Sequence, residues 1–63
     1  MHGKQWTIAD EISRETLTRP TRQSAMATLL MLMREHGDSA EFSCDDAGMS
    51  ITIRRANRGK RGR

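Results

Sequence analysis

The chain is poor in the groups that usually stabilise a very small fold. Its 63 residues include a single cysteine, Cys44, so an internal disulfide is impossible. His2 and His36 are its two histidines, and with Cys44 they match no zinc-ligand spacing. A domain of this length gains only ~3–5 kcal/mol from its core. We therefore expect one economical domain, without a metal or other cofactor, that gains stability from a partner subunit.

Long apolar runs and catalytic motifs are also missing. No stretch of about 18 apolar residues is present, and the first residues lack the apolar run of a signal peptide. We therefore expect a cytoplasmic protein that makes no contact with a membrane. The sequence has no Ser–His–Asp arrangement, glycine-rich phosphate loop or metalloprotease motif. Because acid–base catalysis also needs a cleft, which so short a chain can scarcely build, we expect a binding protein without catalytic residues.

The two signs of charge are divided along the chain. Residues 1–53 carry five basic groups and all eight acidic ones, a net charge of −3. The remaining ten residues carry six basic groups and no acid, a net charge of +6: Arg54, Arg55, Arg58, Lys60, Arg61 and Arg63. Such a segment cannot pack, so we expect a flexible basic tail over residues 55–63. Its cations can neutralise phosphates and release counterions, which favours nucleic acid as a partner over a solubilising role.

The first third of the chain favours a short helix. Thr7 is a suitable N-cap, and Asp10 three residues later completes a pair that resembles a capping box. Ile8 and Ile12 are one turn apart and would share a buried face. The alternative is a strand at Gln5–Ala9.

A longer helix is predicted from Pro20 to His36. Proline disfavours helical geometry in the residue before it and suits the first position of a new helix. Gly37 is a natural C-cap. The expected core stripe consists of Met26, Leu29, Leu30 and Met33. Residues 29–33 are apolar on every side, and because such a helix must be covered all round, we expect a homodimer.

A β-hairpin is predicted at Ala40–Ile53. The inward apolar residues are even-numbered on the first strand and odd-numbered on the second, so only a loop of even length brings them onto one face. A four-residue loop over residues 45–48 pairs Phe42 with Ile51. Gly48 would supply the positive φ of this turn. Cys44 would point inward and behave as a small hydrophobe.

This order of a short helix, a tight turn, a longer helix and a C-terminal hairpin resembles the winged helix–turn–helix family. The likeness is carried by Trp6-Thr7-Ile8-Ala9-Asp10-Glu11-Ile12, by Thr18-Arg19-Pro20-Thr21-Arg22-Gln23-Ser24-Ala25, and by the hairpin as the wing. It implies a minimal α+β fold of the winged-helix type over residues 6–54, after a disordered start at residues 1–5.

The resemblance also implies that the second helix enters the major groove of DNA with its first residues at the base edges. Those positions are Arg19, Thr21, Arg22, Gln23 and Ser24. Arg22 would bind a guanine edge, and Gln23 an adenine edge, with two hydrogen bonds each. The alternative is an ordinary helix start with a solvated polar face.

Three functional hypotheses follow. The first is a small regulator of transcription, of the kind that phages and mobile elements encode, that binds DNA through its second helix and its tail. The second is an inhibitor or adaptor that contacts a host protein through its acidic body. The acidic residues concerned are Asp38, Glu41, Asp45 and Asp46, which are otherwise a solvated face. The third is an RNA-binding accessory protein that works through the tail.

Overall fold

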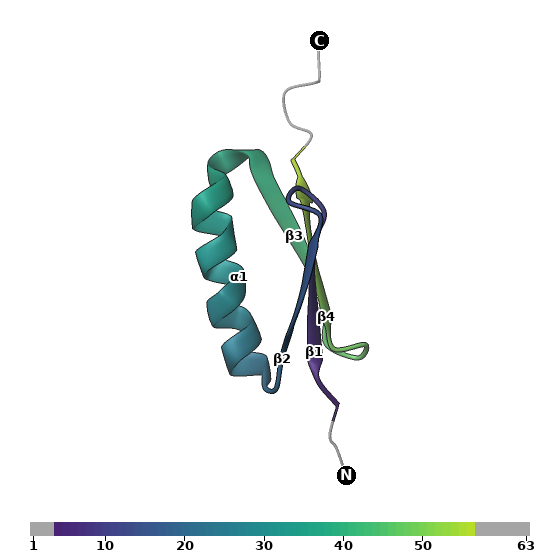
Figure 1. Cartoon of the computed structure of the whole chain (residues 1–63). Helices are drawn as coiled ribbons and strands as arrows, with labels where there is room; N and C mark the ends of the chain where they lie inside the picture. Colours follow the sequence, from purple (N-terminus) through teal and green to yellow (C-terminus); the bar gives the residue numbers. More distant parts are fainter. Residues whose placement is uncertain (1–3, 57–63) are drawn as a thin grey trace.

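A four-stranded sheet covered on one face by one helix makes up the part of the chain that the structure describes. The computed structural model describes residues 4–56. In chain order the elements are β1 (Trp6–Asp10), β2 (Glu15–Arg19), α1 (Arg22–His36), a 3-10 turn η1 (Gly37–Ser39), β3 (Ala40–Asp45) and β4 (Ser50–Arg55) (Figure 1). The strand order is β2-β1-β4-β3. The two central strands are parallel, and each pairs with its outer neighbour in the antiparallel sense. Across residues 4–56, no helix has both the length and the apolar character needed to cross a membrane.

The predicted first helix is wrong, and with it the winged-helix fold class. The chain begins with a β-hairpin, so the architecture is ββαββ and not helix-first. In β1, Trp6, Ile8 and Asp10 are buried while the residues between them are half-buried, which is the two-residue period of a strand. Thr7 caps no helix. Its backbone N–H donates instead to the Met49 carbonyl at 3.0 Å, across the parallel pair.

The long helix is confirmed, and its C-terminal end lies at the predicted residue. It ends at His36, where Gly37 has a φ of 72° and donates its N–H to the carbonyl of Met33. It begins two residues later than expected, because Thr21 is the N-cap. The expected core stripe is only partly right: Leu29 is buried, but Leu30 is 64% exposed.

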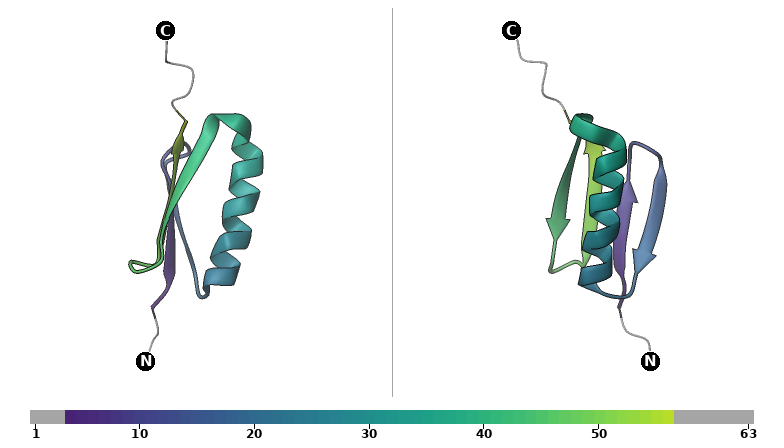
Figure 2. Two further views of the ribbon diagram at one scale, coloured as in Figure 1. Left: turned by 180° about the vertical axis from the view of Figure 1, so that it is seen from behind. Right: turned by 90° about the vertical axis from the view of Figure 1, so that its left-hand side faces the viewer.

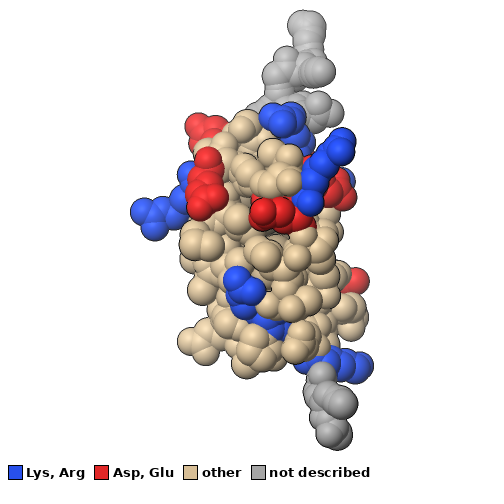
Figure 3. Space-filling model, viewed as in Figure 1, with Lys and Arg blue, Asp and Glu red and all other residues tan. Residues whose placement is uncertain are grey.

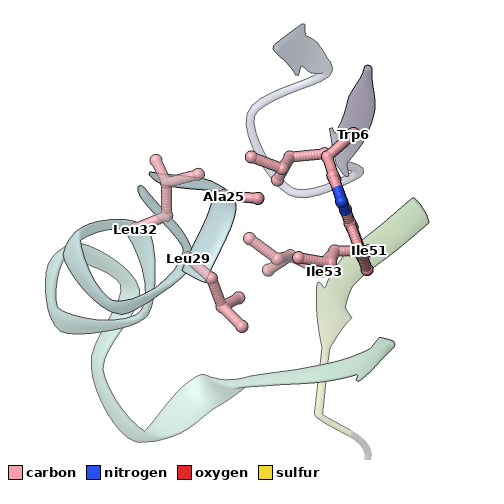
Figure 4. Close-up of a cluster of buried hydrophobic side chains, with 7 residues drawn as sticks. Trp6, Ala25, Leu29, Leu32, Ile51 and Ile53 are labelled. Atoms are coloured by element: carbon pink, nitrogen blue, oxygen red, sulfur yellow. The ribbon is translucent and has the colours of Figure 1, made fainter. Parts of the chain in front are cut away.

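The hydrophobic core lies between the helix and the two central strands (Figures 2 and 4). Its members are Trp6, Ile8, Ala25, Leu29, Leu32, Ile51 and Ile53. The outer strand β3 contributes little to it: Phe42 is 49% exposed, and Cys44, expected to point into the core, is exposed. The helix therefore covers the central strands and leaves the helix-facing side of β3 open.

The C-terminal hairpin has the expected parity but a different register. Phe42 pairs with Ile53 and Cys44 with Ile51, so the loop comprises residues 46–49 instead of 45–48. The shift by two residues keeps each inward side chain on its face. Met49, at φ 54°, takes the left-handed conformation expected of Gly48. Gly48 instead donates its N–H to the Asp45 carboxylate at 3.1 Å, which closes the turn.

The turn between β1 and β2 contains a strained residue that offers a test of the hairpin. Arg14 is exposed and has a φ of 63°, a conformation that costs a side-chain-bearing residue ~1–2 kcal/mol. Arg14→Gly should stabilise the protein by about 0.5–1 kcal/mol, because the relief exceeds the added chain entropy. Urea denaturation measures the change. Arg34→Gly, at an exposed position within α1, should instead destabilise the protein by about 1 kcal/mol. If both variants lose stability, the left-handed conformation of Arg14 in the β1–β2 turn is wrong.

Candidate functional site

The predicted nucleic-acid-binding residues lie at opposite ends of the domain. The helix runs from the end that holds the start of β1 and the β3–β4 loop to the end where β4 finishes (Figures 1 and 2). Arg19, Thr21, Arg22, Gln23 and Ser24 are at the first end, and Arg54 and Arg55 are at the second. A helix of 15 residues separates them by ~20 Å. Arg58, Lys60, Arg61 and Arg63 lie outside the described residues.

Thr21 and Ser24 form the cap of α1. The Ser24 N–H donates to the Thr21 hydroxyl at 3.1 Å, and the Thr21 N–H donates to the Ser24 hydroxyl at 3.3 Å. This reciprocal pair satisfies two backbone donors at the helix start. Both side chains therefore have a structural role that contact with a base would disturb.

The two arginines near the helix start are held by other residues of the domain. The Arg22 guanidinium donates to the Asp46 carboxylate at 2.9 Å and stacks 5.9 Å from the centre of the Trp6 ring. This hydrogen bond raises the pKa of Arg22 and lowers the pKa of Asp46, although both side chains are exposed. Arg19 donates to the Thr28 hydroxyl at 2.8 Å and to the Thr18 carbonyl at 2.7 Å.

The end where β4 finishes gathers most of the remaining basic groups. Arg54 and Arg55 are the last two residues of β4, and both are exposed. Arg54 pairs with Glu41 across the ladder. Within residues 4–56 neither arginine forms an ion pair. Arg34, in the last turn of α1, is exposed at the same end. Figure 3 shows basic and acidic side chains mixed there, so the domain itself offers no uniformly positive face in that view.

A buried carboxylate links this end of the domain together. Asp10 is 1% exposed at the end of β1, and its carboxylate is 2.8 Å from Nε2 of His36 at the end of α1. It also accepts the backbone N–H groups of Ile12 and Ser13 at 3.0 and 3.2 Å, and the Ser13 hydroxyl at 3.1 Å. Burial favours the neutral acid, but the hydrogen bonds from His36 and Ser13 outweigh it and hold the pKa of Asp10 below its ordinary value.

Sequence reasoning missed this pair, since it assigned Asp10 to a helix cap and His36 to the helix end alone. The signal was the parity of Asp10, which places an acid on the same strand face as Trp6 and Ile8. Ser13 and His36 both contact Asp10, so the carboxylate lies between them and the arrangement joins the β1–β2 turn to α1. Among residues 4–56 no three His, Cys, Asp or Glu side chains cluster as metal ligands would.

The surroundings of Cys44 disfavour the thiolate form. The residue is exposed on β3, but partial desolvation of the thiol and the nearby Asp46 carboxylate both raise its pKa. Because the thiolate is the reactive form, the raised pKa reduces the reactivity of this thiol.

No family model, no curated protein and no solved structure matches the chain.

The buried pair predicts how stability depends on acid. Since the pKa of Asp10 is lowered by folding, its carboxylate stabilises the protein above its ordinary pKa of 3.8, and this contribution is lost as pH falls through the folded pKa. Asp10→Asn should cost about 1–3 kcal/mol at pH 7, and much less at the acid limit. Urea denaturation between pH 2.5 and 7 measures both. The exposed Asp38→Asn is the control, and an equal loss for both variants would show that the pair is not stabilising.

Proposed function

We propose that the protein binds duplex nucleic acid through its phosphates, using the basic segment that begins at Arg54 and Arg55. The observation that carries the proposal is the position of these two arginines. They are exposed at the end of β4 and make no ion pair within residues 4–56, at the point where the chain continues into four further cations.

Charge explains why this segment must provide the attraction. Residues 4–56 carry seven basic and eight acidic groups, a net charge of −1, whereas residues 57–63 add four basic groups and no acid. The folded part therefore does not attract phosphates by itself. Each phosphate neutralised by the segment releases counterions, and this term is independent of base sequence. The segment contains no aromatic side chain that could stack on unpaired bases, which favours a duplex over a single strand.

The helix start is the weaker contact. Arg22 would have to leave Asp46 and the Trp6 ring, and Arg19 would have to leave Thr28, before either could reach a base edge. Gln23 is exposed and is the residue of this group best placed to touch the duplex. We therefore expect binding with little preference for base sequence.

The salt dependence of binding tests the proposal. Affinity for a DNA duplex should fall as salt rises, with a slope of about 0.9 in log–log units for each phosphate neutralised. Arg54→Gln with Arg55→Gln should make the slope shallower by about 2, and deletion of residues 57–63 by about 4. Fluorescence anisotropy with duplexes of two unrelated sequences measures affinity and sequence preference together.

The matched control removes two cations at the other end, by Lys4→Gln with Arg22→Gln. It should change the slope far less than the β4 double variant. If the two double variants behave alike, net charge alone governs binding and the proposed segment is wrong. If Arg22→Gln by itself removes a preference for one duplex, the helix start reads bases after all.

A further inference from the structure

The outer edge of β3 is an open hydrogen-bonding edge. The Ala56 N–H donates to the Ser39 carbonyl at 2.7 Å, which sets the phase of the antiparallel ladder between β3 and β4. In that phase the odd-numbered residues of β3 point their backbone groups at β4, and the even-numbered ones point away from it. The N–H and C=O groups of Phe42 and Cys44 therefore face outward, and no backbone bond within residues 4–56 occupies them, whereas the N–H of Ala40 already donates to the Gly37 carbonyl.

The opposite edge of the sheet is partly closed. Bonds from Thr7 to Met49 and from Glu11 to Ile53 set the phase of β1, so Thr16 and Thr18 point outward on β2. The Thr18 carbonyl already accepts the Arg19 guanidinium at 2.7 Å, and Arg19 is itself held by Thr28. An added strand on β2 would have to displace this contact. At Phe42 and Cys44, the β3 edge presents no such obstacle among the described residues.

The two faces beside the β3 edge differ in chemistry. On the face away from the helix, the exposed side chains of β3 are Glu41, Ser43 and Asp45. On the helix side, Phe42 is 49% exposed. Arg22 of α1 bonds to Asp46 just beyond β3, so the flank of α1 that carries Arg22 faces β3. Met26, one turn further along α1, is half-buried on this flank, which is therefore apolar beside β3.

The existing partner of β3 shows which chemistry its side chains accept. Across the ladder, β4 places Ile51 opposite Cys44, Ile53 opposite Phe42 and Arg54 opposite Glu41. A strand added on the outer edge meets the same β3 side chains, since residues directly opposite each other share a face of the sheet. The same alternation of apolar and basic residues suits both edges.

We propose that the β3 edge binds an extended, basic segment of a partner protein, which adds as a fifth strand. The backbone groups of this added strand would bond to Phe42 and Cys44, its apolar side chains would lie beside Phe42, and its basic side chains would face Glu41 and Asp45. This surface is separate from the nucleic-acid segment and does not depend on it. A second copy of the chain fits the edge less well, because two β3 strands would bring Glu41 and Asp45 of each copy close to those of the other.

The test uses a peptide built on the β4 pattern, acetyl-Lys-Ile-Thr-Ile-Arg-amide, with the full-length protein. Hydrogen exchange followed residue by residue by NMR should show that the amides of Phe42 and Cys44 exchange quickly in the free protein and become protected by the peptide. The amides of Glu41 and Ser43, which already face β4, should change little. A peptide with both isoleucine amides methylated cannot donate to β3 and should give no protection.

Charge variants test the recognition of basic residues. Glu41→Lys should weaken peptide binding by about fivefold, and Asp45 is left in place because its carboxylate closes the β3–β4 turn. The matched control, Glu35→Lys, makes the same change in net charge at an exposed position off β3 and should leave affinity nearly unchanged. Equal effects of the two variants would show non-specific attraction and overturn the proposal. Tight binding of the charge-reversed peptide acetyl-Glu-Ile-Thr-Ile-Glu-amide would also overturn the proposal.

Two other occupants of the edge would also overturn the proposal. If Phe42 and Cys44 are protected without peptide, and sedimentation shows a dimer, the occupant is a second copy. If that protection disappears when residues 57–63 are deleted, the occupant is the chain's own basic segment. DNA binding by the variants, measured in parallel, separates failure of this proposal from failure of the nucleic-acid function.

Discussion

A single helix is too narrow to cover a four-stranded sheet, and most features of this protein follow from that. A helix with its side chains is ~10–12 Å across, while neighbouring strands lie ~4.7–4.9 Å apart, so it shields about two strands. The shielded strands here are β1 and β4, whose inward residues Ile8, Ile51 and Ile53 are fully buried. The helix covers the side chains of the outer strands β2 and β3 less completely. Each of these strands also carries one edge of the sheet that no further strand of the described residues covers.

The two outer strands have different surfaces as a result. On β2 an arginine turns back onto the strand's own backbone and is fixed by the helix. On β3 the helix-facing side chains remain exposed and the opposite face is acidic. Charged side chains on an edge are a common protection against pairing between identical chains, and in the proposed complex the same charges would face a partner of opposite sign.

The ends of the domain differ in the same way. One end is held by exposed contacts, namely the ion pair between Arg22 and Asp46 and the cap of α1. The other is held by the buried Asp10 carboxylate, which joins the first hairpin to the last residue of the helix. The basic segment leaves from that second, better anchored end. A firmly held strand end can present Arg54 and Arg55 to a partner without loss of the core beneath them.

Much of this structure was accessible from local sequence signals. The end of the helix at Gly37 could be read directly, because a residue with positive φ and the breaking of helical periodicity coincide there. The parity of the second hairpin and the division of charge were equally local.

The first hairpin could not be predicted from local signals, since Thr7 and Asp10 suit a helix cap as well as a strand. Pairing with β4, more than forty residues later in the chain, decides between the two structures. The burial of Asp10 depends likewise on His36, twenty-six residues later in the chain. Sequence patterns specify what each segment can form, but contacts between distant segments decide which form persists, because only pairing with β4 and packing against α1 together remove the apolar face of β1 from water.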